Sequence, residues 1–446
     1  MKVHFIAIGG SAMHNLALEL HSNGHNVTGS DDEIYDPSRS RLENAGLLPE
    51  QYGWYTDKIN SSIDAVILGM HARKDNPELH RAIELGIPVY SYPEFVAKQS
   101  MNKNRVVIAG SHGKTTTTSM ILHALNQTEK KYDYLVGAQL KGYNRMVKLS
   151  DADLIILEGD EYLSSPIDLR PKMIHYKPNI AVITGIAWDH INVFPTFEDY
   201  VEQFRKFIQD MDEEAVLFYY EKDEELQKLI AEGKHKCKAI PYGQVELTED
   251  KNILRNGSVY PTDLVGYHNF QNMQAASLVA NELGIPEEIF FNAMSSFEGA
   301  DRRLQYALRS TGKTGTVFMD FAHAPSKVKA STEAVKSWYE DVPLVAILEL
   351  HTYSSLNKAF IPQYKGALAA ADKAIVFYNQ HTLDMKKMPS LSKEFVAEAF
   401  DHPNIEIINT TEDLQNSISK DWRSEGVVLL MTSGNFGKTD IIGLLQ

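Results

Sequence analysis

The sequence predicts an α/β protein built from three consecutive domains. Short apolar segments of strand length alternate with stretches of helical periodicity along the whole chain. Glycine-rich turns directly follow two of the apolar segments, which is typical of parallel sheets that bind ligands at the carboxyl ends of their strands. A length of 446 residues also suits about three domains of roughly 150 residues each. We place the domains at residues 1–102, 103–300 and 301–446, the first and last Rossmann-like and the central one built around a P-loop.

Composition argues against several kinds of partner. The formal net charge of −15 disfavours non-specific nucleic-acid binding and a basic membrane-surface patch. No apolar run approaches the roughly 18 residues of a membrane span, and polar residues interrupt the apolar segment near the N-terminus, so we expect no signal peptide. The single cysteine, Cys237, rules out an internal disulfide and a cysteine cluster for zinc. We expect a cytoplasmic protein, a monomer or weak homodimer, that acts on small molecules without nucleic-acid or membrane partners.

The first domain has a βαβ pattern, which implies a parallel sheet with helices on both faces. A first strand and a glycine turn precede a helix that ends near Gly24, and three further strands follow. The strands are expected at Val3–Ile8, Asn26–Ser30, Ala65–Gly69 and Ile87–Tyr90, the turn at Gly9–Ser11 and the helix at Ala12–Asn23.

The glycine turn of this domain has two interpretations. Gly9 and Gly10, with Asp31 about 20 residues later, resemble part of a dinucleotide-binding fingerprint. The full three-glycine spacing is absent, because Met13 and Asn15 stand where later glycines would lie. The turn is therefore either an NAD(P) site or, more generally, an anion site at the N-terminus of the first helix.

The central domain begins with a phosphate-binding loop. The apolar run Val106–Ala109 ends in Gly110, and Gly113-Lys114-Thr115 opens a segment of helical periodicity. In such a loop, backbone N–H groups and the helix N-terminus bind phosphate, the lysine reaches the β- and γ-phosphates and a hydroxyl ligates Mg²⁺. The loop is shorter than the usual GxxxxGK[ST], because Ile108 stands at the first glycine. The alternative is a plain strand–helix turn with an exposed lysine.

Acidic and histidine side chains follow two further apolar segments. Glu158, with Asp160 and Glu161 beyond it, comes after the strand expected at Ala152–Leu157, and Asp189-His190 follows Ile180–Thr184. These positions lie at the sheet edge where ligands bind. Carboxylate oxygens suit Mg²⁺, which takes one or two carboxylates together with substrate phosphates. The alternative is a solvated acidic loop.

A polar cluster at Gly266–Asn272 opens a helix. Asn269 suits an N-cap or first-turn position, and His268 and Asn272, four residues apart, share one helical face. On these residues alone, a capped helix and an adenine site are equally supported. The third domain follows, with strands expected at Thr316–Met319, Leu344–Leu348, Lys373–Phe377 and Val427–Met431.

Taken together and in this order, four motifs resemble those of the Mur ligases, the ATP-dependent amide-forming enzymes of peptidoglycan assembly. They are Gly110–Thr116; Glu158–Glu161 with Asp189-His190; Gly266–Asn272; and Arg302-Arg303 with Asp320-Phe-Ala-His323-Ala-Pro325. The resemblance covers essentially the full length. It implies an ADP-forming ligase that activates a carboxylate as an acyl phosphate, with ATP and Mg²⁺ as cofactors.

The resemblance also implies roles for individual residues. The catalytic residues would be Lys114, His190 and Arg303, and the Mg²⁺ ligands Thr115, Glu158 and His190. ATP would contact Gly110, His112, Gly113, Lys114, Thr115, Thr116, His268, Asn269, Asn272, Arg303 and Asp320. The other substrates would contact Gly9, Gly10, Ser11, Ala12, Met13, Ser30, Asp31, His71, Glu161 and His323.

Motifs of the first domain resemble one branch of the family, the members that use UDP-N-acetylmuramate. Ile8–Met13 and Gly29–Asp31 are similar to the domain that binds UDP in family members using UDP-N-acetylmuramate. Tyr35–Ser40 is similar to members that attach the tripeptide L-alanyl-γ-D-glutamyl-meso-diaminopimelate. The alternative substrate is L-alanine, because Glu349–Tyr353 stands where the L-alanine-adding members carry a His-Arg-Tyr motif, although Thr352 replaces the arginine. A third alternative is a nucleotide-gated P-loop binding protein that is not a ligase.

The sequence departs from the family pattern at three points. Met319 replaces the first acid of an Asp-Asp-Tyr-Ala-His motif, which leaves Asp320, and Gly159 replaces a common alanine. Some relatives use a carbamylated lysine beyond the Asp-His pair. Lys206 lies in that region, and we assign it no such role.

Overall fold

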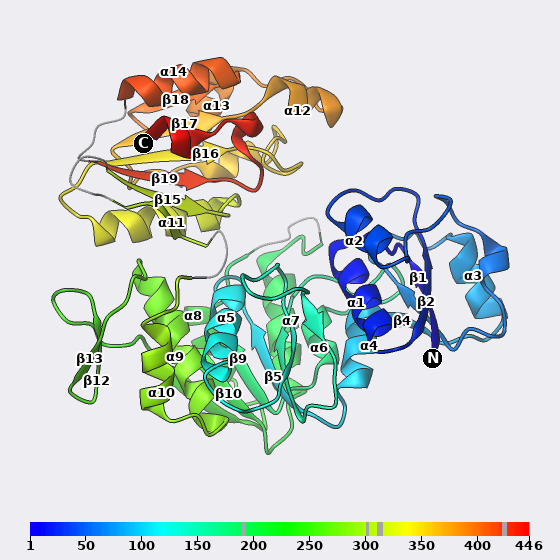
Figure 1. Cartoon of the computed structure of the whole chain (residues 1–446). Coiled ribbons are helices and arrows are strands. Elements are labelled where there is room, and N and C mark those ends of the chain that lie inside the picture. The colour runs from blue at the N-terminus through cyan, green and yellow to red at the C-terminus, as the bar shows by residue number, and fades with distance from the viewer. Residues whose placement is uncertain (189–192, 300–302, 310–314, 422–425, 446) are drawn as a thin grey trace. The chain divides into compact units, whose positions relative to one another are not determined.

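The structure, a computed structural model, describes residues 1–188, 193–299, 303–309, 315–421 and 426–445 (Figure 1). The chain forms two compact units. Unit 1 comprises Met1–Tyr260 and Gln271–Ser295, and unit 2 comprises Pro261–Phe270 and Ser296–Gln446. Unit 1 contains two extended sheets and unit 2 contains one. The predicted α/β class with parallel sheets is confirmed, whereas the predicted domain boundaries stay predictions.

The first sheet of unit 1 is parallel, with strand order β2-β1-β3-β4. Its strands are β1 (Lys2–Ile6), β2 (Asn26–Ser30), β3 (Ala65–Leu68) and β4 (Val89–Ser91), and the helices are α1 (Ser11–Ser22), α2 (Ser38–Asn44), α3 (Pro77–Glu84) and α4 (Tyr92–Gln99), with a 3₁₀ turn at Thr56–Lys58. β1 ends earlier than predicted because Ala7 has a φ of 68° and the N–H groups of Ala7 and Ile8 both donate to the Ser30 carbonyl. β4 begins later than predicted, after Pro88, which has no N–H to donate.

The second sheet of unit 1 has the order β11-β10-β9-β5-β8-β6-β7 and is parallel except for the β6–β7 pair. Its strands are β5 (Asn104–Ala109), β6 (Asp133–Leu135), β7 (Val147–Lys148), β8 (Leu154–Glu158), β9 (Ile180–Ile183), β10 (Val216–Tyr220) and β11 (Lys238–Tyr242). The helices are α5 (Lys114–Leu125), α6 (Lys172–His175), α7 (Phe197–Gln209), α8 (Glu224–Ala231) and α10 (Glu287–Met294), and an antiparallel pair joins β12 (Ile253–Arg255) to β13 (Ser258–Tyr260). Helix α9 (Tyr267–Glu282) begins in unit 2 and ends in unit 1.

Unit 2 contains a sheet of order β14-β15-β19-β16-β17-β18, parallel except for the β14–β15 pair. Its strands are β14 (Gln305–Leu308), β15 (Thr316–Asp320), β16 (Leu344–Glu349), β17 (Lys373–Phe377), β18 (Ile405–Ile408) and β19 (Val427–Met431). The helices are α11 (Pro325–Trp338), α12 (Gln380–Met385), α13 (Lys393–Phe400), α14 (Thr411–Asp421) and α15 (Ile441–Leu445), with 3₁₀ turns at Ile361–Tyr364 and Phe436–Lys438. The predicted bounds of β17 and β19 are confirmed. β15 and β16 each extend one residue further, so that Asp320 and Glu349 end their strands.

The core of unit 1 is continuous across its two sheets. Phe5 and Leu16 of the first part and Val107 and Ile155 of the second belong to one cluster of buried apolar side chains. This burial holds the two sheets of unit 1 in one body, because apolar area removed from water contributes about 25 cal/mol per Å². Among the described residues, none of the helices combines the length and apolar character that a bilayer crossing requires.

Candidate active site

The P-loop connects β5 to α5 and has glycines at two left-handed positions. Gly110 has a φ of 120°, and a Cβ there would lie 2.8 Å from the Thr184 backbone nitrogen. Gly113 has a φ of 79° and forms the N-cap of α5, with Asn272 packed directly against it. The N–H of Ser111 donates to the Gly185 carbonyl at 2.9 Å, which anchors the loop to the end of β9. The glycines therefore permit both the turn and the close approach of its neighbours.

Lys114 opens α5 and lies among carboxylates. Its Nζ donates to Glu161 Oε2 at 2.7 Å and to the Gly110 carbonyl at 2.5 Å. Burial by itself would lower the pKa of the ammonium, but the carboxylates of Glu161, Asp160 and Glu158 together raise that pKa above its ordinary value. Lys114 is therefore a fixed positive charge at the start of the helix, as phosphate binding requires.

Thr115 and Glu158 form an oxygen-rich pair beside this lysine. The Thr115 hydroxyl donates to Glu158 Oε1 at 2.8 Å, and the Gly137 N–H donates to Glu158 Oε2 at 2.8 Å. Glu158 is the last residue of β8 rather than the first residue after it, because it pairs in register with Ile108 of β5. A hydroxyl and a carboxylate at this spacing fit Mg²⁺, which accepts few protein ligands when phosphates and water supply the rest.

Tyr200 is a site residue that sequence reasoning missed. Its hydroxyl lies 2.8 Å from Ser111 Oγ of the P-loop and donates to Glu161 Oε1 at 3.0 Å. Tyr200 belongs to α7, about ninety residues after the loop, and its ring is fully buried. The sequence offered no local signal for it beyond the aromatic periodicity of that helix.

Most of the residues predicted to bind the nucleotide sugar lie in or beside the turn after β1. The Gly9 N–H donates to Asp31 Oδ2 at 2.7 Å, and a Cβ on Gly9 would lie 2.8 Å from the Ile34 side chain. Gly10 forms the N-cap of α1 without a side-chain cap, so N–H groups of the first turn, which includes Ser11, Ala12 and Met13, remain for a ligand. Lys58 Nζ donates to the Ser30 hydroxyl at 3.2 Å. His71 is exposed in the loop after β3.

Unit 2 carries the other predicted nucleotide and substrate residues. Asp320 is buried at the end of β15 and accepts a hydrogen bond from Ser331. Burial lowers the pKa of His268, and the charge of Asp320 partly opposes that shift. The Arg303 guanidinium carbon lies 5.2 Å from the ring centre of Phe321. His323 Nδ1 lies 2.9 Å from the Phe321 carbonyl oxygen.

The structure selects one of the two positions predicted for Asn269, whereas some other predicted site residues lie outside the described residues. Asn269 is the third residue of α9 and donates to the Val265 carbonyl, so it is a first-turn residue and not an N-cap. Asp189, His190 and Arg302 lie outside the described residues. Lys206 is 58% exposed and lies 3.9 Å from Glu202.

Unit 1 therefore brings together Lys114, Thr115, Glu158, Glu161 and Asn272 around one loop. His112 and Thr116 belong to the same loop and the first turn of its helix. His268, Asn269, Arg303, Asp320 and His323 belong to unit 2. Their joint action on one nucleotide stays a prediction.

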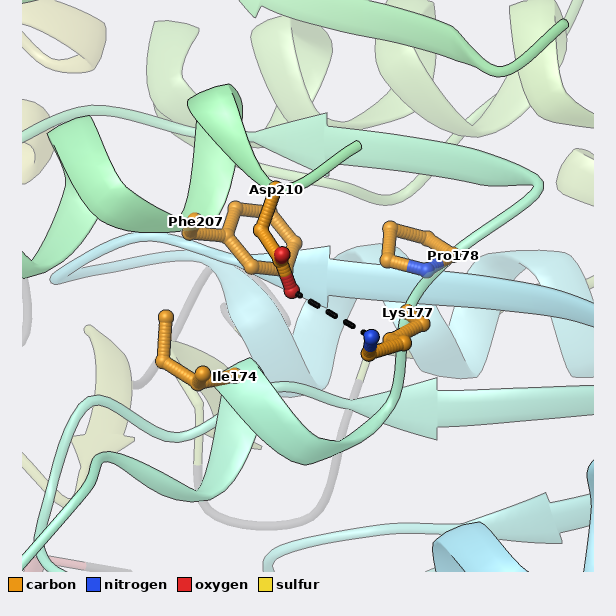
Figure 2. Close-up of a pocket in the computed structure, with 5 residues that line it drawn as sticks. All are labelled: Ile174, Lys177, Pro178, Phe207 and Asp210. Atoms are coloured by element: carbon orange, nitrogen blue, oxygen red, sulfur yellow. Dashed lines mark ion pairs between the residues drawn. The ribbon is translucent and has the colours of Figure 1, made fainter. Parts of the chain in front are cut away.

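A small pocket lies elsewhere in unit 1 (Figure 2). Ile174, Pro178 and Phe207 line it, and Lys177 Nζ lies 3.9 Å from Asp210 Oδ2. Pro178 precedes β9, whereas the P-loop follows β5, and these two strands are parallel. The pocket is therefore at the opposite edge of the sheet from the P-loop.

Two family models match the chain from residue 2 to residue 280, apart from residues 104–107. The model described as "Mur ligase family, catalytic domain" matches residues 2–103, and "Mur ligase middle domain" matches residues 108–280. A UDP-N-acetylmuramate–L-alanine ligase of Desulforamulus reducens is 32% identical, over 80% of this chain and 79% of that protein. A UDP-N-acetylmuramate–L-alanyl-γ-D-glutamyl-meso-2,6-diaminoheptandioate ligase of Escherichia coli K12 is 27% identical, over 98% and 96%.

A solved structure supports the same fold. The murein peptide ligase of Psychrobacter arcticus matches with a TM-score of 0.67 and 21% identity, covering all of this chain and 98% of that one. The fold and the P-loop site, together with the family models and the relatives, define an ATP-dependent amide-bond ligase. The chain belongs to the Mur ligase family, and its cofactors are ATP and Mg²⁺. The predicted ligase class is thus confirmed.

Proposed function

We propose that this ligase joins the carboxylate of UDP-N-acetylmuramate to the amino group of L-alanyl-γ-D-glutamyl-meso-diaminopimelate. The observation that carries the proposal is that one compact unit holds both an uncapped glycine turn before α1 and the Lys114–Glu158 site after β5 and β8. The first suits the pyrophosphate of a nucleotide sugar and the second the phosphates of ATP.

The proposed chemistry must bring two anions together. The γ-phosphoryl group and the attacking carboxylate repel each other, so the protein has to neutralise charge and hold both groups in line. Lys114 supplies a cation that its carboxylate neighbours keep protonated. Thr115 and Glu158, with His190, would hold the Mg²⁺, which when bound neutralises phosphate charge. Arg303 would support the transferred phosphate, and closure of the site would exclude water from the acyl phosphate.

The tripeptide is favoured over L-alanine by the Glu349–Tyr353 segment. Thr352 stands where the L-alanine-adding members carry arginine. Its hydroxyl bonds within a local turn, because Ser355 N–H donates to Thr352 Oγ1 at 3.0 Å and the Thr352 N–H donates to Ser355 Oγ at 2.9 Å. The segment thus lacks a guanidinium for a small amino acid's carboxylate.

L-alanine remains the second candidate, because relatives named for each substrate match the chain over most of its length. One experiment separates the two. The protein is incubated with ATP, Mg²⁺ and UDP-N-acetylmuramate, with the tripeptide or L-alanine in parallel, and phosphate release and product mass are measured. We expect product in the assay with the tripeptide and none in the assay with L-alanine. Product with L-alanine alone would replace the proposal with the second candidate, and phosphate release without either amine would contradict both.

A further inference from the structure

A path of hydrogen bonds and short backbone steps joins the two candidate ligand sites of unit 1. The path starts at the glycine turn before α1 and passes through His14 and Asn15. It then crosses to the segment Asn144–Leu149, which contains β7, and reaches Glu158. We propose that His14 and Asn15 are positioning residues that couple the nucleotide-sugar turn to the Mg²⁺–ATP site. This inference rests on the proposed function, because it assumes that the turn binds the nucleotide sugar.

His14 holds the turn itself. The imidazole is 2% exposed, and its Nδ1 lies 3.0 Å from the Gly10 carbonyl oxygen and 3.0 Å from Ser38 Oγ. Its Nε2 lies 3.1 Å from Asn15 Nδ2 and 3.3 Å from the Arg41 guanidinium. An amide nitrogen and a guanidinium can only donate, so Nε2 must accept and Nδ1 must carry the proton. The ring is therefore a neutral donor to Gly10. Burial lowers the pKa of His14, which also favours the neutral imidazole.

Asn15 holds the His14 ring in place and connects it to Met146. Its Nδ2 donates to the Ser11 carbonyl at 2.8 Å as well as to His14, and its Oδ1 accepts from the Met146 N–H at 3.0 Å. A flipped amide would set its Nδ2 against the Met146 donor, so the network permits one orientation. The side chain is 1% exposed, which makes an unpaired polar atom there costly.

The segment Asn144–Leu149 carries the connection to the ATP side. The Val136 N–H donates to the Met146 carbonyl at 2.9 Å, and the next residue, Gly137, donates to Glu158 Oε2. Glu158 Oε1 in turn accepts from Thr115 of the P-loop helix. One end of the path therefore contacts the glycine turn proposed to bind the nucleotide sugar. The other end contacts Thr115 and Glu158, which are proposed to bind Mg²⁺ and ATP.

The same segment is fastened along one face of α1. Arg145 Nη1 lies 2.5 Å from Glu19 Oε2 and 2.6 Å from Ser22 Oγ, and the Leu149 N–H donates to Glu19 Oε1 at 2.8 Å. Asn15, Glu19 and Ser22 follow helical spacing, so a shift of α1 moves the segment as a body. An element held this firmly at both ends transmits displacement, because a packed interface does not deform continuously.

The test measures coupling between ligands rather than activity. The dissociation constant of UDP-N-acetylmuramate is measured by calorimetry with and without Mg²⁺ and a non-hydrolysable ATP analogue. For the wild-type protein, the ratio of the dissociation constant without the ATP analogue to that with it is expected to be about fivefold or more, within the usual range of coupling between sites. By linkage, the affinity of the ATP analogue must change by the same factor when UDP-N-acetylmuramate is bound. In Asn15→Leu, which keeps the branched side-chain shape but loses the bonds to Ser11, His14 and Met146, the ratio is expected to fall toward one.

A second test variant and a control variant complete the experiment. His14→Asn retains a donor for Gly10 but loses the acceptor for Asn15, so its ratio should also fall even if Asn15→Leu does not fold. Ser62→Ala removes a side-chain hydrogen bond to Asn60, away from α1 and the segment Asn144–Leu149, and should keep the wild-type ratio. Unchanged ratios in folded Asn15→Leu or His14→Asn, or a wild-type ratio near one, would overturn the coupling. Failure of the wild-type protein to bind UDP-N-acetylmuramate would instead contradict the proposed function and the coupling with it.

Discussion

The ammonium nitrogen of Lys114 lies 2.7 Å from a carboxylate oxygen of Glu161, a residue 47 positions later that is 1% exposed. Tyr200 donates to the other oxygen of the same carboxylate. The positive charge meant for phosphate is thus held in place by a buried partner from another strand end. This pairing separates two effects of changing Lys114, one on stability and one on turnover.

Lys114→Ala is expected to lower turnover at least about a hundredfold, since it removes a charge aimed at the transferred phosphate. It should also destabilise the fold by about 3–5 kcal/mol, because the buried carboxylate of Glu161 loses its ion pair with Lys114. The double variant Lys114→Ala/Glu161→Gln should recover most of the stability and none of the activity. Steady-state kinetics and denaturant unfolding report the two quantities. Near-normal ligation by folded Lys114→Ala would exclude the P-loop assignment.

Glu158→Gln is expected to raise the Mg²⁺ concentration needed for half-maximal turnover, or to abolish activity, because a neutral amide is a poorer ligand for a hard cation. The amide oxygen can still accept from the Gly137 N–H while the amide NH₂ group donates to the Thr115 hydroxyl oxygen, so the fold should stay near wild-type stability. A Mg²⁺ titration of ligation measures the effect, with Glu202→Gln, a half-exposed carboxylate of α7, as the control. A titration curve that matches wild type would count against Glu158 as a metal ligand.

Gly113→Ala is expected to disable the P-loop. The added Cβ would lie 3.0 Å from Asn272 Cγ and overlap its Oδ1, at a φ of 79° that already disfavours alanine. Gly142→Ala provides a matched control, because Gly142 has a φ of 84° and open space around the added atom. The control should lose only about 1 kcal/mol of stability and keep ATP affinity. Equal losses of ATP affinity in both variants would show that backbone strain alone, and not the contact with Asn272, matters.

Asp160 should make stability depend on pH below neutrality. Burial would raise the pKa of this carboxyl, but the ammonium groups of Lys172 and Lys114 outweigh burial and hold the pKa well below the ordinary 3.8. A pKa lowered by folding contributes stability that is present above the ordinary value and is lost as the pH falls below it. Thermal midpoints from pH 7 to about pH 2 should therefore fall more steeply in wild type than in Asp160→Asn. The exposed Asp151→Asn variant should follow wild type, and parallel curves for Asp160→Asn would refute the pairing.

Arg303→Ala should depress turnover far more than ATP affinity, since a contact made mainly in the transition state appears in the rate. In unit 2, its guanidinium lies over Phe321. Phe321→Leu removes the ring while keeping the charge, and should therefore lower turnover less. If Arg303→Ala leaves both affinity and turnover near wild type, Arg303 does not bind the phosphate, and Arg302 becomes the residue to test.

The sequence by itself determined the local parts of this protein. Strands β17 and β19 match their predicted bounds because nearly continuous apolar runs bounded by polar or turn residues specify buried parallel strands. The P-loop and the residues after β8 were also predictable, since their roles depend on glycine, lysine and carboxylate spacing within a few positions. Strand ends were less predictable, as at Ala7, where the backbone turns to meet Ser30 from the neighbouring strand.

The tertiary structure decided which distant residues complete the site. Tyr200 reaches Glu161, Gly137 binds Glu158, and Met146 binds Asn15 across sequence separations that no local pattern encodes. Each contact depends on how helices and loops pack over the sheets of unit 1, which minimises buried unpaired polar groups and exposed apolar area together. Local spacing therefore specified the chemistry of the site, whereas long-range packing specified its supports and the connection between its two halves.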